Sequence, residues 1–340
     1  MITIGALIIL FGVFVGWVWF STIQPDQVQS APVNSDQDMP LISEKEEIKL
    51  LNWNVQFMAG KGYHFYYEGG QDKRPKSEDI RKTTKGVAKI IKEENPDIIL
   101  LQEVDDGAKR TDHKDQLGEL LDLLPDDYRA HSSAFYWKAL FSPHPKILGS
   151  VGMKLSVISK YKIKSATRYQ LALKPDNWFV RQFDLKRAVL EIIFPRKNEK
   201  DFHIFNTHLT AFAFGSDVRS HQVEEIHNIL KETSKKDHPW IIGGDFNLEP
   251  PVQGNKSREK EVIKNLFDNY KAVPGYEEVK GPDAEKWYTY FSNEPEIKQP
   301  NKTIDYYFCS EDILLKNYYV RSRDTLKISD HLPIIAEIKI

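Results

Sequence analysis

The stretch Trp240-Ile241-Ile242-Gly243-Gly244-Asp245-Phe246-Asn247 is an apolar run that ends on two glycines, an acid and an amide. The isoleucines predict a strand covered on both faces, and the glycines let the backbone turn tightly or approach a ligand closely. Asp245 and Asn247 stand two residues apart, so in extended geometry they point the same way. A carboxylate that deprotonates water beside an amide that holds an oxyanion suits phosphoester chemistry. The alternative is a turn in which an Asx side chain satisfies its own backbone.

Length, charge and cysteine count limit the classes of protein to which this chain can belong. A chain of 340 residues is long enough for a large α/β domain, and its net charge of -2 provides no global basic field to gather nucleic acid. Any polyanion binding must therefore be local. The single cysteine, Cys309, lies in an apolar run, which excludes an intrachain disulfide and a thiolate metal cluster. Nothing in the composition implies a protein partner.

The N-terminal segment is apolar and carries no charged residue before Asp26. Ile2 to Phe20 is long enough to span a bilayer, so the sequence predicts a transmembrane anchor over residues 1–23. Aromatic residues typical of a membrane interface lie at its end, namely Trp17, Trp19 and Phe20. A cleaved signal peptide is the alternative, although the basic n-region and a small-x-small site directly after Phe20 are missing. We expect a single-pass membrane protein with its catalytic domain outside the cytoplasm.

Residues 24–47 are polar and contain three prolines, which predicts a flexible linker. The globular domain is then expected over residues 48–340. In it, apolar runs alternate with amphipathic segments such as Ser77 to Asn95, so both halves contain a strand-helix-strand unit.

Polar residues follow the predicted strands where each one ends. Because open α/β sheets bind ligands at the carboxyl ends of their strands, these residues are candidates for one site. Taken singly, each has a structural alternative, such as a solvated acid, a satisfied core histidine or a turn residue. The set consists of Asn54, Glu103, His208, Asp245, Asn247, Asp330 and His331, with Asp305 inside a further strand.

Six motifs in this order resemble the metal-dependent endonuclease/exonuclease/phosphatase superfamily, whose members include deoxyribonuclease I, neutral sphingomyelinases and inositol polyphosphate 5-phosphatases. The resemblance covers about residues 48 to 340. The motifs are Leu51-Asn52-Trp53-Asn54, Leu101-Gln102-Glu103-Val104, Asn206-Thr207-His208-Leu209, Gly243-Gly244-Asp245-Phe246-Asn247, Ile304-Asp305-Tyr306 and Ser329-Asp330-His331-Leu332-Pro333. The resemblance implies an α/β fold, a four-layer sandwich of two mixed sheets flanked by helices, here preceded by the transmembrane helix.

The resemblance also implies a metal site. It makes Glu103 the principal Mg²⁺ ligand, with Asn54 beside it and Asp330 as a further acid; Mn²⁺ is the alternative ion. Carboxylate and amide oxygens suit Mg²⁺, which is typically held by one or two carboxylates and substrate phosphate.

Catalytic roles follow from the same resemblance. Asp245 positions or deprotonates the attacking water, and Asn247 holds the phosphate. Asp305 fixes His331, whose imidazolium stabilises the charge that develops on phosphorus. His208 contacts the phosphate and protonates the leaving oxygen.

The sequence thus predicts a membrane-anchored, Mg²⁺-dependent phosphoesterase, with a lipid or small phosphoester favoured as substrate. A nuclease acting on DNA or RNA is the alternative, and a non-catalytic binding module on the same fold is the alternative of another class. The Asn-Thr-His-Leu motif at His208 resembles the deoxyribonuclease, sphingomyelinase and 5-phosphatase branches, so we expect no action on abasic sites. The aromatic stretch Phe135 to Phe141 is either core packing or a lip that contacts substrate or membrane.

Overall fold

Apolar residues on both faces of the central strands produce two packed sheets. The computed structural model describes residues 2–43, 47–211, 213, 215–251 and 257–340. The first sheet, named here the β3 sheet, has the order β13-β14-β3-β4-β6-β5-β2. Its strands are β13 (Leu314–Val320), β14 (Ile334–Lys339), β3 (Glu47–Asn54), β4 (Ile98–Asp105), β6 (Gly149–Ser159), β5 (Ala130–Ser142) and β2 (Val33–Asn34).

The second sheet, named the β10 sheet, has the order β1-β7-β8-β9-β10-β12-β11. Its strands are β1 (Val28–Ser30), β7 (Ser165–Gln170), β8 (Ala188–Phe194), β9 (Phe202–His208), β10 (Trp240–Asp245), β12 (Asp305–Cys309) and β11 (Lys271–Val273). Each sheet contains one parallel pair, β3 with β4 and β9 with β10, among antiparallel neighbours. Two mixed sheets were predicted, and both are present.

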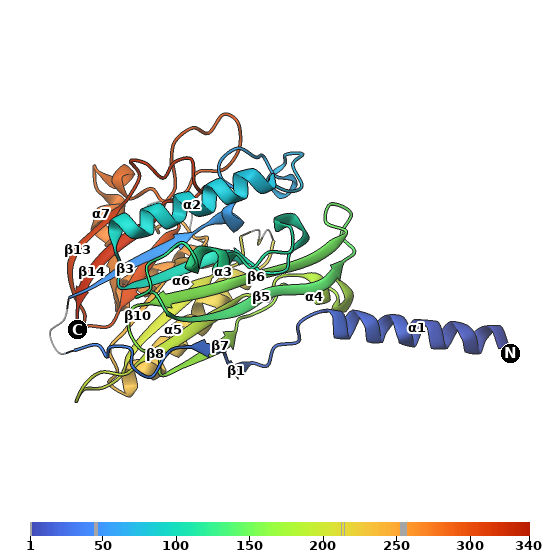
Figure 1. Ribbon diagram of the computed structural model, residues 1–340, viewed down its shortest axis with the longest axis horizontal. Coiled ribbons are helices and arrows are strands. Elements are labelled where there is room, and N and C mark those ends of the chain that lie inside the picture. The colour runs from blue at the N-terminus through green and yellow to red at the C-terminus, as the bar shows by residue number, and fades with distance from the viewer. Residues whose placement is uncertain (1, 44–46, 212, 214, 252–256) are drawn as a thin grey trace.

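Helices cover the outer faces of the sheets, so the domain has four layers (Figure 1). On the β3 sheet lie α2 (Ser77–Glu94) and α3 (Gln116–Leu121), and on the β10 sheet lie α5 (Val218–Lys235) and α6 (Arg258–Asn269). The main core lies between the sheets. Shorter elements are α4 (Trp178–Phe183), α7 (Tyr276–Lys280) and the 3-10 turns η1 (Gln56–Met58), η2 (Tyr66–Glu68), η3 (Lys109–Thr111) and η4 (Ala284–Trp287).

The predicted transmembrane helix is wrong. The apolar segment does form a helix, α1 (Ile2–Ser21), but its second half packs on the domain. The Phe14 ring lies 6.1 Å from that of Phe179, and Val18 is fully buried. In the first half of α1, residues 5–13 are exposed.

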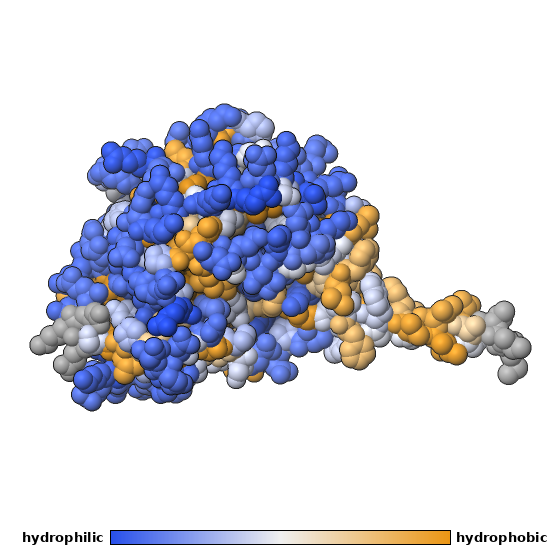
Figure 2. Space-filling view, viewed as in Figure 1, coloured by the Kyte–Doolittle hydropathy of each residue, from blue (hydrophilic) through white to orange (hydrophobic). Residues whose placement is uncertain are grey.

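No helix among the described residues is long and apolar enough to cross a membrane. The prediction of an anchor over residues 1–23 is therefore wrong, and so is the prediction of a single-pass, extracytoplasmic localisation that depended on it. Figure 2 shows apolar side chains along α1 and on the part of the domain that it meets. In sequence, an apolar run of this kind gives the same signal whether it packs on lipid or on protein.

The segment predicted as a flexible linker, residues 24–47, also differs from expectation. β1 pairs with β7, and β2 pairs with β5, so the segment supplies the edge strand of both sheets. Met39 and Ile42 are buried in the core between the sheets. Residues 44–46 lie outside the described residues. Unpaired strand edges on the domain explain why so polar a segment becomes ordered.

Glu94 ties the end of α2 to the β3 sheet. Its carboxylate accepts hydrogen bonds from Lys49 Nζ at 2.7 Å, Tyr319 Oη at 2.6 Å and Arg321 Nη1 at 2.9 Å. Burial raises the pKa of Glu94, but these three donors outweigh burial and lower the pKa below its ordinary value. The ionised carboxylate therefore stabilises the folded state.

We expect Glu94→Gln to lower the free energy of unfolding by about 1 kcal/mol at pH 7, because solvent screens part of the interaction. The carboxylate contributes fully above the unfolded pKa of about 4.3, and its contribution disappears as the pH falls through the lower folded pKa. Urea titrations at pH 7 and at a pH below the folded pKa should therefore show the two proteins converging at the lower pH. Glu232→Gln, on the exposed face of α5, is the control and should match the parent. A gap of equal size at both pH values would contradict this account.

Candidate active site

The β10 sheet brings three of the predicted residues together at one edge. Asp245, at the end of β10, is in register with His208 on β9 and with Asp305 on β12. The glycine before Asp245 is required by this packing, since a Cβ on Gly244 would lie 2.1 Å from the carbonyl oxygen of Thr207. The sequence signal of two glycines thus reports a close approach between neighbouring strands.

The β3 sheet contributes Asn54 and Glu103. Glu103 lies at a register shift in β4 and has a left-handed backbone with φ 58°. Such bulges re-aim a side chain near the end of a strand. Asn54 Nδ2 donates to Glu103 Oε1 at 3.2 Å and to Asp245 Oδ2 at 3.0 Å, so one amide joins the carboxylates of both sheets. Its Oδ1 accepts from the backbone N–H of Gln56 at 3.0 Å.

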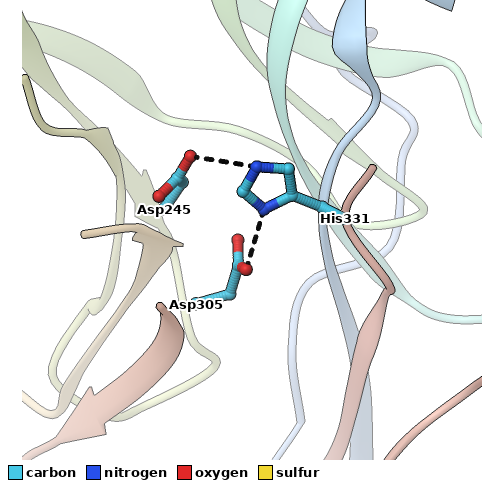
Figure 3. A group of neighbouring side chains, drawn as sticks. All are labelled: Asp245, Asp305 and His331. Carbon is cyan, nitrogen blue, oxygen red and sulfur yellow. Dashed lines mark hydrogen bonds and ion pairs between the residues drawn. The ribbon is translucent and has the colours of Figure 1, made fainter. Parts of the chain in front are cut away.

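His331 lies between two acids, as Figure 3 shows. Its Nδ1 is 2.9 Å from Asp305 Oδ2, and its Nε2 is 3.5 Å from Asp245 Oδ2. Burial lowers the pKa of His331, but Asp305 and Asp245 raise it, with a net value of about 10. The ring is therefore an imidazolium at neutral pH.

Asp245 is buried, and its carboxylate accepts hydrogen bonds from Asn54 and Asn247. Burial raises its pKa, and the neighbouring Asp305 raises it further, against the lowering effect of His331. The backbone N–H of Asn247 donates to its Oδ1 at 2.9 Å. The Asx turn that the sequence offered as an alternative is therefore present, and it orients the candidate base. Asn247 has φ 50°, and its Nδ2 donates to the carbonyl of Leu209 at 3.1 Å.

His208 is held by Tyr136, which sequence reasoning missed. Tyr136 Oη accepts from the backbone N–H of Glu103 at 3.2 Å and lies 3.2 Å from His208 Nδ1. Burial, with the charge of Arg187, lowers the pKa of His208 well below its ordinary value. A neutral ring that accepts the Tyr136 hydroxyl at Nδ1 carries its proton on Nε2, which lies 3.3 Å from Asp245 Oδ2. The alternation of buried and half-buried residues along β5 is the sequence signal that could have identified Tyr136 as an inward-pointing residue.

Asp330 is buried beside a second group of acids. Its Oδ2 accepts from Gln56 Nε2 at 2.9 Å, and its Oδ1 accepts from Ser329 Oγ at 3.2 Å. Burial raises the pKa of Asp330, and Glu68 and Glu103 raise it further, against the lowering effect of His331. Glu68 is the last residue of η2 and was also missed. The three carboxylates repel one another, which is the setting that a cation relieves.

Two sets of residues could hold a metal. Among the described residues, Asp245, Asp305 and His331 offer ligand atoms that all lie within 4.8 Å of one another. In that group, however, the imidazolium already neutralises the acids, and a protonated ring has no lone pair to give. The predicted set is Glu103, Asn54 and Asp330. There the Glu103 side chain is 20% exposed, and Asn54 turns its amide nitrogen towards it.

These groups line a cavity of about 1170 Å³. The lining includes the polar residues Glu103, His208, Asp245, Asn247, Asp330 and His331. It also includes apolar residues, namely Trp137, Ile147, Phe179, Phe183 and Leu185. The stretch Phe135 to Phe141 therefore contributes both to the core, through Tyr136, and to the cavity wall, through Trp137. The arrangement gives a buried carboxylate of raised pKa, a cation and hydrogen-bond donors in one partly apolar pocket.

A chain of buried amides fixes the two sheets beneath this site. Gln102 Nε2 donates to Asn52 Oδ1 at 2.8 Å and to Asn206 Oδ1 at 2.7 Å. Asn206 Nδ2 in turn donates to the carbonyls of Leu101 at 2.9 Å and Ser156 at 3.0 Å. The bonds of Asn206 run from β9 to the β3 sheet, so they set the position of one sheet relative to the other.

Comparison with known proteins agrees with the fold. The sequence model described as Endonuclease/Exonuclease/phosphatase family matches residues 51–331. Similar solved structures include an endonuclease/exonuclease/phosphatase from Beutenbergia cavernae, at 20% identity and TM-score 0.59, covering 86% of this chain and 72% of that one. The human Nocturnin catalytic domain with bound sulfate has 18% identity and TM-score 0.54, covering 91% of this chain and 96% of that one.

TDP2 from C. elegans is similar as well, at 17% identity and TM-score 0.54, covering 89% of this chain and 77% of that one. A comparison with curated proteins finds no match. Because the identities are low, the structural likenesses speak for the fold alone.

We expect Asn206→Ala to lower the free energy of unfolding by about 2 kcal/mol, because it leaves the carbonyls of Leu101 and Ser156 and one proton of Gln102 without partners. Urea denaturation of the variant measures this loss. Asn317→Ala, at an exposed amide on β13, is the matched control and should stay within about 0.5 kcal/mol of the parent. Equal stability of the two variants would show that the amide chain does not hold the sheets together.

Proposed function

Because the chain belongs to the endonuclease/exonuclease/phosphatase family, we propose that it hydrolyses a P–O bond of a phosphoester by in-line attack of water. Members of this family are generally metal-dependent phosphoesterases or nucleases. The observation that carries the proposal is the connected set Asp305, His331, Asp245, Asn54 and Glu103, which crosses from one sheet to the other. A domain retained only for binding has no need of a buried base beside a buried imidazolium.

Each side chain has a role that its surroundings support. Asp245 accepts the proton of the attacking water, since burial raises its pKa towards the operating range of a general base. Asp305 orients His331, and the imidazolium stabilises negative charge on the phosphoryl oxygens. Asn247 binds the phosphate. His208 acts as a neutral hydrogen-bond donor through Nε2, because its lowered pKa leaves no imidazolium proton to deliver to the leaving oxygen.

The residues around Glu103 fit Mg²⁺, or alternatively Mn²⁺. Glu68, Glu103 and Asp330 all line the cavity and provide hard oxygen atoms, and their negative charges repel one another. We propose Glu103 and Asp330 as the residues that hold the ion, with Asn54 keeping the Glu103 carboxylate in place. When bound there, the ion polarises a phosphoryl oxygen and offsets its charge. The chain's own part is to orient that phosphate against the water at Asp245.

An organic phosphoester of limited size, lipid or small and soluble, is the favoured substrate. The apolar residues of the cavity lining support this choice, because Trp137, Phe179 and Phe183 suit an apolar ester group. A nuclease is the second candidate, supported by Lys174 and Lys302 at the cavity wall. The net charge of -2 weighs against long duplex DNA. A panel of sphingomyelin, inositol phosphates, single-stranded DNA and RNA, each with Mg²⁺ and with chelator, separates these classes.

We expect Glu103→Gln to weaken Mg²⁺ binding, because it removes the most accessible carboxylate of the proposed metal site. Titration of the full chain with Mn²⁺, followed by electron paramagnetic resonance, measures the affinity without turnover. A loss of 10- to 100-fold or more is the scale typical of changes at a metal site. Glu277→Gln, an exposed acid on α7, is the control. An unchanged Mn²⁺ affinity would remove Glu103 from the site.

Asp245→Asn and His331→Ala should each lower kcat by roughly 10²- to 10⁴-fold, with a smaller effect on KM. Both groups act on the transition state, so substrate binding should survive their loss. Steady-state kinetics on the phosphoester that the panel identifies gives both constants. Asp312→Asn, in an exposed turn, is the control. Rates within about threefold of the parent would contradict the role assigned to that residue.

A further inference from the structure

Arg187 is a buried cation that the catalytic roles above leave unused. It lies directly before β8, lines the cavity beside His208, and is only 6% exposed. Its Nη1 is buried and has no hydrogen-bond partner among the described residues. None of the ion pairs formed within those residues involves Arg187 either. The guanidinium contacts the face of the Tyr136 ring, with the guanidinium carbon 5.2 Å from its centroid.

Arg110, which is half-buried, and Arg168, which is buried, show what a structural role looks like in this protein. Arg110 forms a two-pronged pair with Asp105, at 2.7 and 2.9 Å. Arg168 also has one orphaned nitrogen, but its side chain donates to the carbonyls of Phe135 at 3.0 Å and Lys186 at 2.8 Å and to Gln170 Oε1 at 2.9 Å. Arg187 has neither a carboxylate partner nor a comparable set of acceptors.

An unpaired buried cation costs stability unless something satisfies it. Arg187 lines the cavity, so an anion that enters the cavity from outside can supply the missing partner. A phosphate oxygen suits the site, because the guanidinium fork matches phosphate geometry and binds it by charge-assisted hydrogen bonds.

We propose that Arg187 binds an anionic oxygen of the substrate's phosphate, as a recognition residue additional to Asn247. The proposal rests on the proposed function for the identity of the ligand as a phosphoester. Tyr136 serves both parts of the site: its hydroxyl holds His208 and Glu103, and its ring supports the guanidinium. Phe183 and Leu185 line the same cavity, and apolar side chains of this kind suit the ester group of the substrate.

The test is binding of inorganic phosphate to the full chain by isothermal titration calorimetry in the presence of Mg²⁺. Arg187→Met should weaken phosphate binding about tenfold or more, and Arg187→Lys should recover part of the affinity. Arg168→Met is the matched control and should leave phosphate affinity within about threefold of the parent. Parent protein that shows no phosphate binding in the millimolar range, or an Arg187→Met variant with unchanged affinity, would overturn the proposal.

Thermal stability separates recognition from a structural role. Arg187→Met should melt at or above the parent temperature, since it removes an uncompensated buried charge. Arg168→Met should melt lower, because it leaves two carbonyls and a side-chain amide oxygen unpaired. A loss of stability in Arg187→Met as large as in Arg168→Met, without loss of phosphate affinity, would assign Arg187 to the scaffold. Phosphate binding that depends on Arg187 in a protein that turns over no phosphoester would keep this proposal and refute the hydrolase.

Discussion

The buried amides Asn52, Gln102 and Asn206 set the geometry on which the rest of the site depends. Two sheets packed only through aliphatic side chains could shift against each other at little cost, since dispersion is not directional. Hydrogen bonds of 2.7 to 3.0 Å between amides have one good geometry and a high cost when broken inside a core. They lie one or two residues before the strand ends that carry Asn54, Glu103 and His208. Those ends therefore meet at a fixed separation.

Charged side chains are distributed unevenly around the site that the two sheets form. On one side His331 is neutralised by two acids, and on the other Glu68, Glu103 and Asp330 have too few cations for their number. Arg187 shows the opposite imbalance, as a cation without an acid. A protein selected for stability alone would pair these groups with one another. Because these groups line one cavity without pairing with one another, they are preorganised to interact with a charged ligand.

Sequence reasoning reached the parts of the site that local pattern encodes. Glu103, His208 and Asp245 each follow an apolar run, and the two mixed sheets were implied by the resemblance of the six motifs to a known family. Tyr136 and Arg187 were missed because their roles come from neighbours far along the chain, and their local pattern is that of an ordinary strand. The membrane anchor was wrong for a related reason: α1 and a spanning helix have the same composition, and only the docking surface at Phe179 distinguishes them.

The strap formed by β1 and β2 has a consequence for how this chain reaches its fold. Residues 28–34 leave the ribosome early, yet their partners on β5 and β7 are synthesised about 100 and about 140 residues later. Until then β1 and β2 have no strand to pair with, and in any molecule cleaved behind residue 34 both sheets present a bare edge, at residues 131–132 of β5 and 167–169 of β7. Such edges pair readily with other chains. The N-terminal strands β1 and β2 thus protect the sheet edges from pairing with other chains, and they also link the two sheets.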